Sequence, residues 1–89
     1  MKRAGYQASF RFVRLAAGAL VGLHPWCARV RERTGAAVGA VERGQDVFVE
    51  FNHAFQVRSD DVLFVCGTLA SLDQFVREFQ TASVESPRV

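Results

Sequence analysis

The sequence has few of the residues that build metal centres and disulfides. It contains two cysteines and two histidines among 89 residues. Cys27 and Cys66 lie in apolar surroundings and belong to no CxxC motif, which favours free, buried thiols in a reducing compartment. Combining them with His24 or His53 does not give the four-ligand spacing of a zinc site. We therefore expect no metal, no cofactor and no structural disulfide.

Long hydrophobic runs are also missing. The longest, Leu15–Leu23, has nine residues and includes two glycines. A transmembrane helix needs about 20 predominantly apolar residues. The start of the sequence shows no pattern of a secretory signal peptide. The expectation is a soluble polypeptide, which is compatible with a place in a larger membrane assembly.

Motifs of catalysis and phosphate binding are absent as well. No Gly-rich phosphate loop and no Rossmann fingerprint occurs, and no Ser-His-Asp order is evident. Asp60 and Asp61 are adjacent, so in a strand their side chains would point to opposite faces. Turn formation suits these two residues better. His53 beside Asn52 is interpreted either as an exposed loop histidine or as a ligand contact or general base. We expect no catalytic residues and no enzymatic activity.

The charge is too balanced for an ordinary nucleic-acid-binding domain. Eleven basic and nine acidic side chains give a net charge of +2, whereas such domains usually show a clustered basic face. The one basic cluster is Arg29–Arg33. It is either a solvated helix face or a site for an anion or nucleotide, and in both cases the side chains project outward. We expect no nucleic-acid partner.

The chain is short and rich in apolar residues. A length of 89 residues allows one domain, and a chain of this size buries only roughly 60–65% of its unfolded surface. Hydrophobic residues make up 49% of the sequence, with eight phenylalanines. We therefore expect part of the apolar surface to face another subunit or domain.

Strand patterns dominate the middle of the chain. Val and Phe are enriched there, and Gly, Asn and Asp mark the breaks. A tight turn around Gly44 follows the first strand, and the connection Asn52–Asp60 precedes the third. The first and third are apolar on both faces, which predicts burial on both sides. The predicted strands are Ala36–Arg43, Asp46–Phe51 and Asp61–Cys66.

One more strand and two helices flank this block. Phe10–Leu15 alternates apolar and basic residues, as a strand does. A helix is expected from Pro25, with Trp26 and Val30 on one face, to a stop at Gly35. A last helix carries an apolar stripe over Leu72–Phe79, capped by Thr68 or by Ser71.

The predicted fold class is therefore α+β. The order is β-α-β-β-β-α, with a mixed or largely antiparallel sheet and the helices packed on it. Residues 1–9 are expected to form a flexible segment, residues 10–80 the domain, and residues 81–89 a disordered tail.

Several short motifs, in order, resemble one family. Together they are similar to the TrkA-C domain, the C-terminal lobe of RCK regulators of potassium conductance, over roughly Phe10–Gln80. The motifs are Leu20-Val21-Gly22 ("LvG"), Arg31-Glu32-Arg33-Thr34-Gly35 ("lRertG"), the strand and turn Ala36–Gly44 ("vvairrdG"), Asp61–Thr68 ("D-vlvvlGt") and the final helix Leu72–Phe79.

The resemblance implies a cytoplasmic ligand-sensing module of a potassium channel or transporter, at the inner face of the membrane. Such lobes usually follow a Rossmann-type lobe, dimerise through sheet and helices, and hold ligands at the dimer interface. Some members bind a cyclic dinucleotide, and others bind nucleotides or cations. Arg31 matches a basic position near that pocket. Asn52 and His53 are the other candidate ligand contacts.

This sequence departs from the family pattern at three places. Asp60 stands where a Gly usually precedes the signature Asp. Phe51-Asn52-His53 stands where a proline is common. Ala36-Ala37 stands where the cyclic-dinucleotide-binding branch often has an Asn. Three functions are therefore compared below: a ligand-sensing regulatory lobe, a dimerisation or assembly module without a small-molecule ligand, and a small enzyme.

Overall fold

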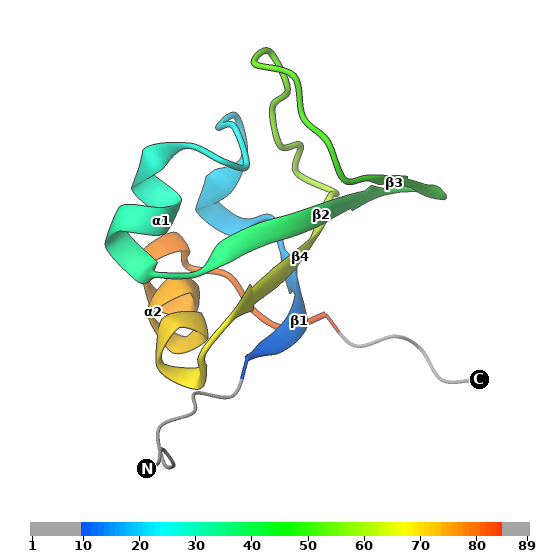
Figure 1. Cartoon of the computed structure of the whole chain (residues 1–89). Coiled ribbons are helices and arrows are strands. Elements are labelled where there is room, and N and C mark those ends of the chain that lie inside the picture. Colours follow the sequence, from blue (N-terminus) through cyan, green and yellow to red (C-terminus); the bar gives the residue numbers. More distant parts are fainter. Residues whose placement is uncertain (1–9, 85–89) are drawn as a thin grey trace, which may run out of the picture.

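The computed structural model describes residues 10–84 and contains a four-stranded sheet with two α-helices (Figure 1). Every neighbouring pair of strands is antiparallel, in the order β1-β4-β2-β3. This confirms the predicted α+β class and the order of its elements. The strands are β1 (Arg11–Ala16), β2 (Ala37–Arg43), β3 (Asp46–Phe48) and β4 (Val62–Gly67); the helices are α1 (Ala28–Thr34), α2 (Leu69–Phe79) and the 3-10 turn η2 (Gly18–Leu20).

Both helices pack on the same face of the sheet. The apolar stripe of α2 buries Leu72, Phe75 and Phe79 as predicted, and the rings of Phe75 and Phe79 are 4.9 Å apart. The strands contribute alternate residues to this core, as the period of two requires. The core residues are Leu15, Ala17, Leu20, Val30, Ala36, Val38, Val41, Phe51, Val57, Leu63, Val65, Leu72, Phe75 and Phe79.

The opposite face of the sheet is only partly covered. In β4, Leu63 and Val65 are buried, but the alternate residues, including Phe64, are half-buried. In β2, Gly39 is exposed. The prediction that these two strands are buried on both faces was therefore wrong, because both helices lie on one side. Phe12 on β1 remains 69% exposed.

The structure selects one of the two predicted caps of α2 and shortens β3. Thr68, not Ser71, caps α2: its hydroxyl accepts the backbone N–H of Ser71 at 3.1 Å. Ser71 is already inside the helix. β3 ends at Phe48 rather than at Phe51, because Phe51 turns into the core and packs on an aromatic ring outside the sheet.

The chain after α2 also differs from the predicted tail. Residues 81–84 lie beside β1, where Val84 N–H donates to the Arg14 carbonyl at 2.9 Å and Ala16 N–H donates to the Ala82 carbonyl at 3.0 Å. Ser83 forms an isolated antiparallel bridge with Leu15. These four residues thus cover part of the free edge of β1. Residues 1–9 and 85–89, where the flexible ends were expected, lie outside the described residues.

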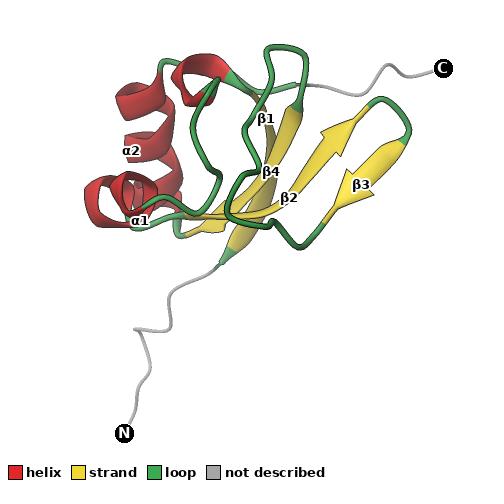
Figure 2. Cartoon of the chain, turned by 90° about the horizontal axis from the view of Figure 1, so that it is seen from above, coloured by secondary structure: helices red, strands yellow, loops and turns green. Residues whose placement is uncertain are grey.

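Two long connections run side by side at one end of the sheet (Figure 2). One is the segment from Val21 to Cys27 between η2 and α1, and the other is the loop between β3 and β4. Val57 joins them twice, because its N–H donates to the Leu23 carbonyl at 3.0 Å and its carbonyl accepts the Gly22 N–H at 2.8 Å. No helix within residues 10–84 is long and apolar enough to cross a membrane.

Candidate ligand-binding site

The junction of α1 and β2 places a basic side chain beside the start of a strand. Gly35 adopts φ 79° as the left-handed residue after α1, a conformation that favours glycine. The buried Thr34 hydroxyl donates to the Val30 carbonyl at 2.6 Å and accepts the Ala36 N–H at 2.9 Å. The chain therefore reverses within two residues, so the last turn of α1 faces the first residues of β2.

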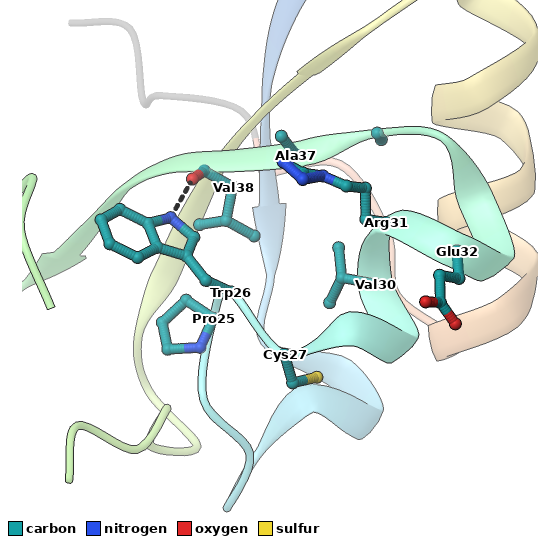
Figure 3. Close-up of a pocket in the computed structure, with 9 residues that line it drawn as sticks. Pro25, Trp26, Cys27, Val30, Arg31, Glu32, Ala37 and Val38 are labelled. Carbon is teal, nitrogen blue, oxygen red and sulfur yellow. Dashed lines mark hydrogen bonds between the residues drawn. The ribbon is translucent and has the colours of Figure 1, made fainter. Parts of the chain in front are cut away.

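Arg31 lies on that last turn. Its side chain extends from α1 across to Ala37 at the start of β2 (Figure 3). Arg33 forms an ion pair with Glu78 at 3.0 Å, whereas Arg31 forms no ion pair within residues 10–84. An exposed guanidinium without a carboxylate partner is available to an external anion.

Trp26 forms the facing wall of the same space. Its indole Nε1–H donates to the Val38 carbonyl at 3.0 Å, and its ring meets the Phe51 ring edge-on at a centroid distance of 4.8 Å. The side chain nevertheless stays 52% exposed. Two contacts fix the ring while part of it remains open to solvent, so it is a preorganised apolar surface.

His24, two residues before Trp26, connects Trp26 to the β3–β4 loop. Its Nδ1 accepts the Trp26 backbone N–H at 3.0 Å, and its Nε2 lies 2.9 Å from the Asn52 carbonyl oxygen. The His24 ring also packs edge-on against Phe51, with centroids 6.2 Å apart. One histidine therefore connects the pocket wall to the neighbouring loop.

These elements enclose a pocket of about 460 Å³ (Figure 3), within the range of small-molecule sites. Trp26 and Arg31 flank it, and apolar side chains from α1 and β2 line the space between them. Glu32 is the one acidic residue of the lining. The lining residues are Pro25, Trp26, Cys27, Val30, Arg31, Glu32, Ala36, Ala37 and Val38.

The structure separates the three predicted contact residues. Arg31 lines the pocket, whereas Asn52 and His53 lie in the β3–β4 loop and do not line it. The Asn52 side chain is used locally, because its Oδ1 accepts the Ala54 N–H at 2.9 Å. Asn52 reaches the pocket only indirectly, through its backbone carbonyl and His24. The roles of all three residues in binding remain predictions.

Sequence reasoning missed Trp26 as a pocket residue. It assigned Trp26 to a helix face, but α1 begins at Ala28, so Trp26 stands just before the helix. Pro25 gave no signal for this, because a proline restricts the residue before it, here His24, and not Trp26. Pro25 itself is buried.

The pocket lining offers a guanidinium and an aromatic ring as groups that can bind a ligand. The pocket lining contains a thiol and a carboxylate, in Cys27 and Glu32, but no histidine or hydroxyl that could serve as the partner of a nucleophile. Within the described residues, no group of three His, Cys, Asp or Glu side chains could hold a metal ion. A flat aromatic surface opposite a guanidinium fits a ligand that carries both a planar group and a negative charge.

Comparisons with known proteins identify the fold. The C domain of the potassium transport protein KtrA, in complex with c-di-AMP, is similar with a TM-score of 0.68 and 21% identity, over 78% of this chain and 82% of that chain. BusR of S. agalactiae, in complex with its busAB promoter DNA, is similar with a TM-score of 0.63 and 16% identity, over 90% of this chain and 40% of that chain. No protein-family model and no curated protein matches the chain. At these identities the likeness shows the fold alone, and the fold is that of an RCK C domain.

Proposed function

We propose that the chain is a non-catalytic regulatory domain that binds a small anionic ligand, a nucleotide in the first place. It would act in the cytoplasm as a homodimer, attached to a Rossmann-type lobe, and would bias the gate of a potassium channel or transporter. The observation that carries this proposal is the pocket between Trp26 and Arg31, on a fold shared with a c-di-AMP-bound KtrA domain.

The pocket explains how such a ligand would be selected. Arg31 supplies a fixed positive charge for a phosphate, and Trp26 supplies a flat surface for a base. Ala36-Ala37 stands where the dinucleotide-binding branch of the family often has an Asn, so side-chain hydrogen bonds from that place are not available. Recognition would then depend on Arg31 and Trp26, which favours a site of broader selectivity.

Gating requires that the ligand prefer one arrangement of two subunits over another. In a homodimer with the pocket near the subunit boundary, a ligand that touches both subunits would supply this preference. Exposed apolar side chains, among them Phe12 and Val47, are consistent with a partner surface. Sedimentation analysis of the full chain would measure whether the dimer forms and whether a ligand strengthens it.

A thermal-shift screen of the full chain tests the proposal. The compounds are c-di-AMP, mononucleotides, KCl and inorganic phosphate. A ligand at 100 times its dissociation constant adds about 2.7 kcal/mol of stability, which for a domain of this size raises Tm by roughly 10 °C or more.

Arg31→Ala is the informative variant, and Arg29→Ala is its control. Arg29 is also exposed on α1 but does not line the pocket. Arg31→Ala should lose most of the shift, and Arg29→Ala should keep it. No shift with any compound, or equal shifts in both variants, would contradict binding at this pocket.

The second candidate function is assembly without a small-molecule ligand. The observation that favours it is the partly covered sheet face with Phe12 exposed, together with Ala36-Ala37 at the place where an Asn is common. A dimer that forms equally well with and without every compound, and that Phe12→Ser weakens, would support this function.

The DNA in the BusR structure calls for a separate test. With a net charge of +2, this chain is expected to bind duplex DNA weakly and without sequence preference. A gel-shift titration at about 150 mM salt measures this. Tight, salt-resistant binding would contradict the expectation that the chain has no nucleic-acid partner.

A further inference from the structure

His24 uses both of its ring nitrogens to connect two segments that are far apart in the sequence. The Trp26 backbone N–H donates to Nδ1 at 3.0 Å, and Nε2 lies 2.9 Å from the Asn52 carbonyl oxygen. A backbone N–H can only donate and a carbonyl oxygen can only accept. The arrangement therefore fits one form of the ring: neutral, with its proton on Nε2.

Protonation of the ring conflicts with this arrangement. An imidazolium carries a proton on both nitrogens, so Nδ1–H would point at the Trp26 N–H and the two donors would face each other. The bond from Nε2 to the Asn52 carbonyl would survive. The charged ring would therefore release the Trp26 backbone N–H, while the ring itself stayed bonded to the Asn52 carbonyl of the loop.

We propose that His24 is a proton-sensitive latch on the pocket wall. In its neutral form it fixes the backbone of Trp26 beside the β3–β4 loop, and the gain of a proton releases the Trp26 backbone N–H. Histidine side chains gain their proton between about pH 8 and pH 5. The pocket is accordingly ordered at the upper end of this range and loosened at the lower end. The consequence for ligand affinity rests on the proposed function, but the latch itself does not.

Within residues 10–84, no charged side chain forms an ion pair with the His24 ring. The partners of the ring are the Trp26 N–H, the Asn52 carbonyl and the rings of Trp26 and Phe51. The titratable residues nearest in sequence to Trp26 and Asn52 are Cys27, Glu50 and His53. None of these three forms a hydrogen bond or ion pair with the His24 ring within residues 10–84.

Protonation of His24 should change the surroundings of Trp26 and leave the path of the backbone unchanged. The two segments stay joined at Val57 by two backbone hydrogen bonds that do not titrate. Trp26 also keeps its indole bond to the Val38 carbonyl. Loss of the bond to His24 should therefore lower the protection of the Trp26 amide from hydrogen exchange by roughly 2- to 10-fold, the size of one net hydrogen bond.

Fluorescence gives a direct measurement, because Trp26 is the only tryptophan of the chain. Its emission is followed from pH 8 to pH 5 in the wild-type chain, in His24→Gln and in His53→Gln. His53 is the only other histidine, so it is the matched control. The wild type and His53→Gln should show one transition with the slope of a single proton, and His24→Gln should show none. A transition that persists in His24→Gln overturns the proposal.

Nuclear magnetic resonance of the wild-type ring tests the latch without a variant. The ¹⁵N spectrum at pH 8 should show the proton of His24 on Nε2, and the protection of the Trp26 amide, corrected for the intrinsic pH dependence of exchange, should fall as the ring is protonated. A proton on Nδ1 at pH 8, or unchanged protection at pH 5, overturns the proposal even if His24→Gln does not fold.

The link to the ligand is measured separately with c-di-AMP, whose phosphodiester groups do not titrate in this range. Its affinity should fall from pH 8 to pH 5 in the wild type and in His53→Gln. Affinity that is independent of pH would overturn the effect of the latch on binding and leave the proposed function intact. If c-di-AMP and the other screened compounds do not bind at any pH, the proposed function fails, and the fluorescence and tautomer results still decide the latch.

Discussion

α1 and α2 lie side by side on one face of the sheet, and they differ in nearly every property that stabilises a helix. α2 has eleven residues, a Thr68 cap and three buried apolar side chains. α1 has seven residues, and no side chain caps it at Cys27. Its stability must come from tertiary contacts, because an isolated helix of this length does not form. The pocket lies against the helix with the weaker intrinsic support, as binding regions often do.

The largest expected effect comes from removing the centre of α2. Phe75 is fully buried, so Phe75→Ala should cost about 3–5 kcal/mol through lost burial and a cavity. The counterpart on α1 is Val30→Ala, which removes fewer buried atoms and should cost roughly 2 kcal/mol. Urea unfolding of both variants measures the difference. Equal losses would show that α1 contributes as much to the core as α2.

The second prediction concerns the β3–β4 loop and its contact with β2 rather than either helix. Arg43 makes two hydrogen bonds of 2.8 Å to the buried Asp61 carboxylate and one of 3.1 Å to the Gln56 carbonyl. The guanidinium also lies over the rings of Phe48 and Phe55. Arg43→Ala leaves the Asp61 charge buried and should cost about 3 kcal/mol. The control Arg77→Ala removes an exposed pair with Asp73 and should cost less than about 0.5 kcal/mol.

The same pair gives stability a defined pH dependence. Burial raises the pKa of Asp61, but hydrogen bonds from Arg43 and from the Arg58 N–H outweigh it, so the net pKa is below the ordinary value. The stabilisation is therefore complete above about pH 4, the ordinary range of Asp, and is lost as the pH falls through the lowered pKa. Urea midpoints between pH 6 and pH 2 measure this loss, which should be smaller in Arg43→Ala. An equal loss in both proteins would assign the acid sensitivity to other carboxylates.

A smaller effect is expected at the start of α2. Thr68→Ala removes the hydroxyl that accepts the Ser71 N–H and should cost about 1 kcal/mol. Thr68→Ser keeps the acceptor and serves as the control, with a loss of a few tenths. Thermal unfolding monitored by circular dichroism separates the two. A loss as large for Ser as for Ala would show that the methyl group matters and the cap does not.

Most of the fold could be predicted from sequence because its signals are local. The alternation in β1, the glycine after α1 and the stripe of α2 each depend on residues close together in the chain. The burial of β4 on one face only could not be predicted from such local signals. A run such as Val62–Cys66 is apolar on both faces, and only the placement of the helices decides which face is covered.

The candidate site was less predictable because its contacts join distant segments. Arg31 was found from a motif at the end of a helix. Trp26 depends on the Val38 carbonyl and on Phe51, and His24 depends on the Asn52 carbonyl. Contacts of a side chain with a backbone atom leave no residue-type signal at the partner position. Asn52 was predicted as a ligand contact, whereas in the structure its backbone carbonyl makes the contact with His24.

The last prediction concerns a substitution that should stabilise α1, the weaker of the two helices. Cys27 has φ −67° and ψ 152°, the extended conformation of an N-cap residue, but its side chain accepts no hydrogen bond from the helix. Serine is among the preferred residues at this position, because its oxygen accepts an N–H of the first turn. Cys27→Ser should therefore stabilise the chain by about 0.5–1 kcal/mol, with almost no change in side-chain volume. Cys66→Ser on β4 is the control, and it should be neutral or destabilising because no helix begins there. A further outcome would connect this prediction to His24. If Cys27→Ser stabilises the protein and also reduces the pH-dependent change in Trp26 emission, then the position of Trp26 depends on the missing cap as well as on His24. If it lowers stability, the thiol contributes more through packing at the pocket than a cap would, and the weakness of α1 has another origin.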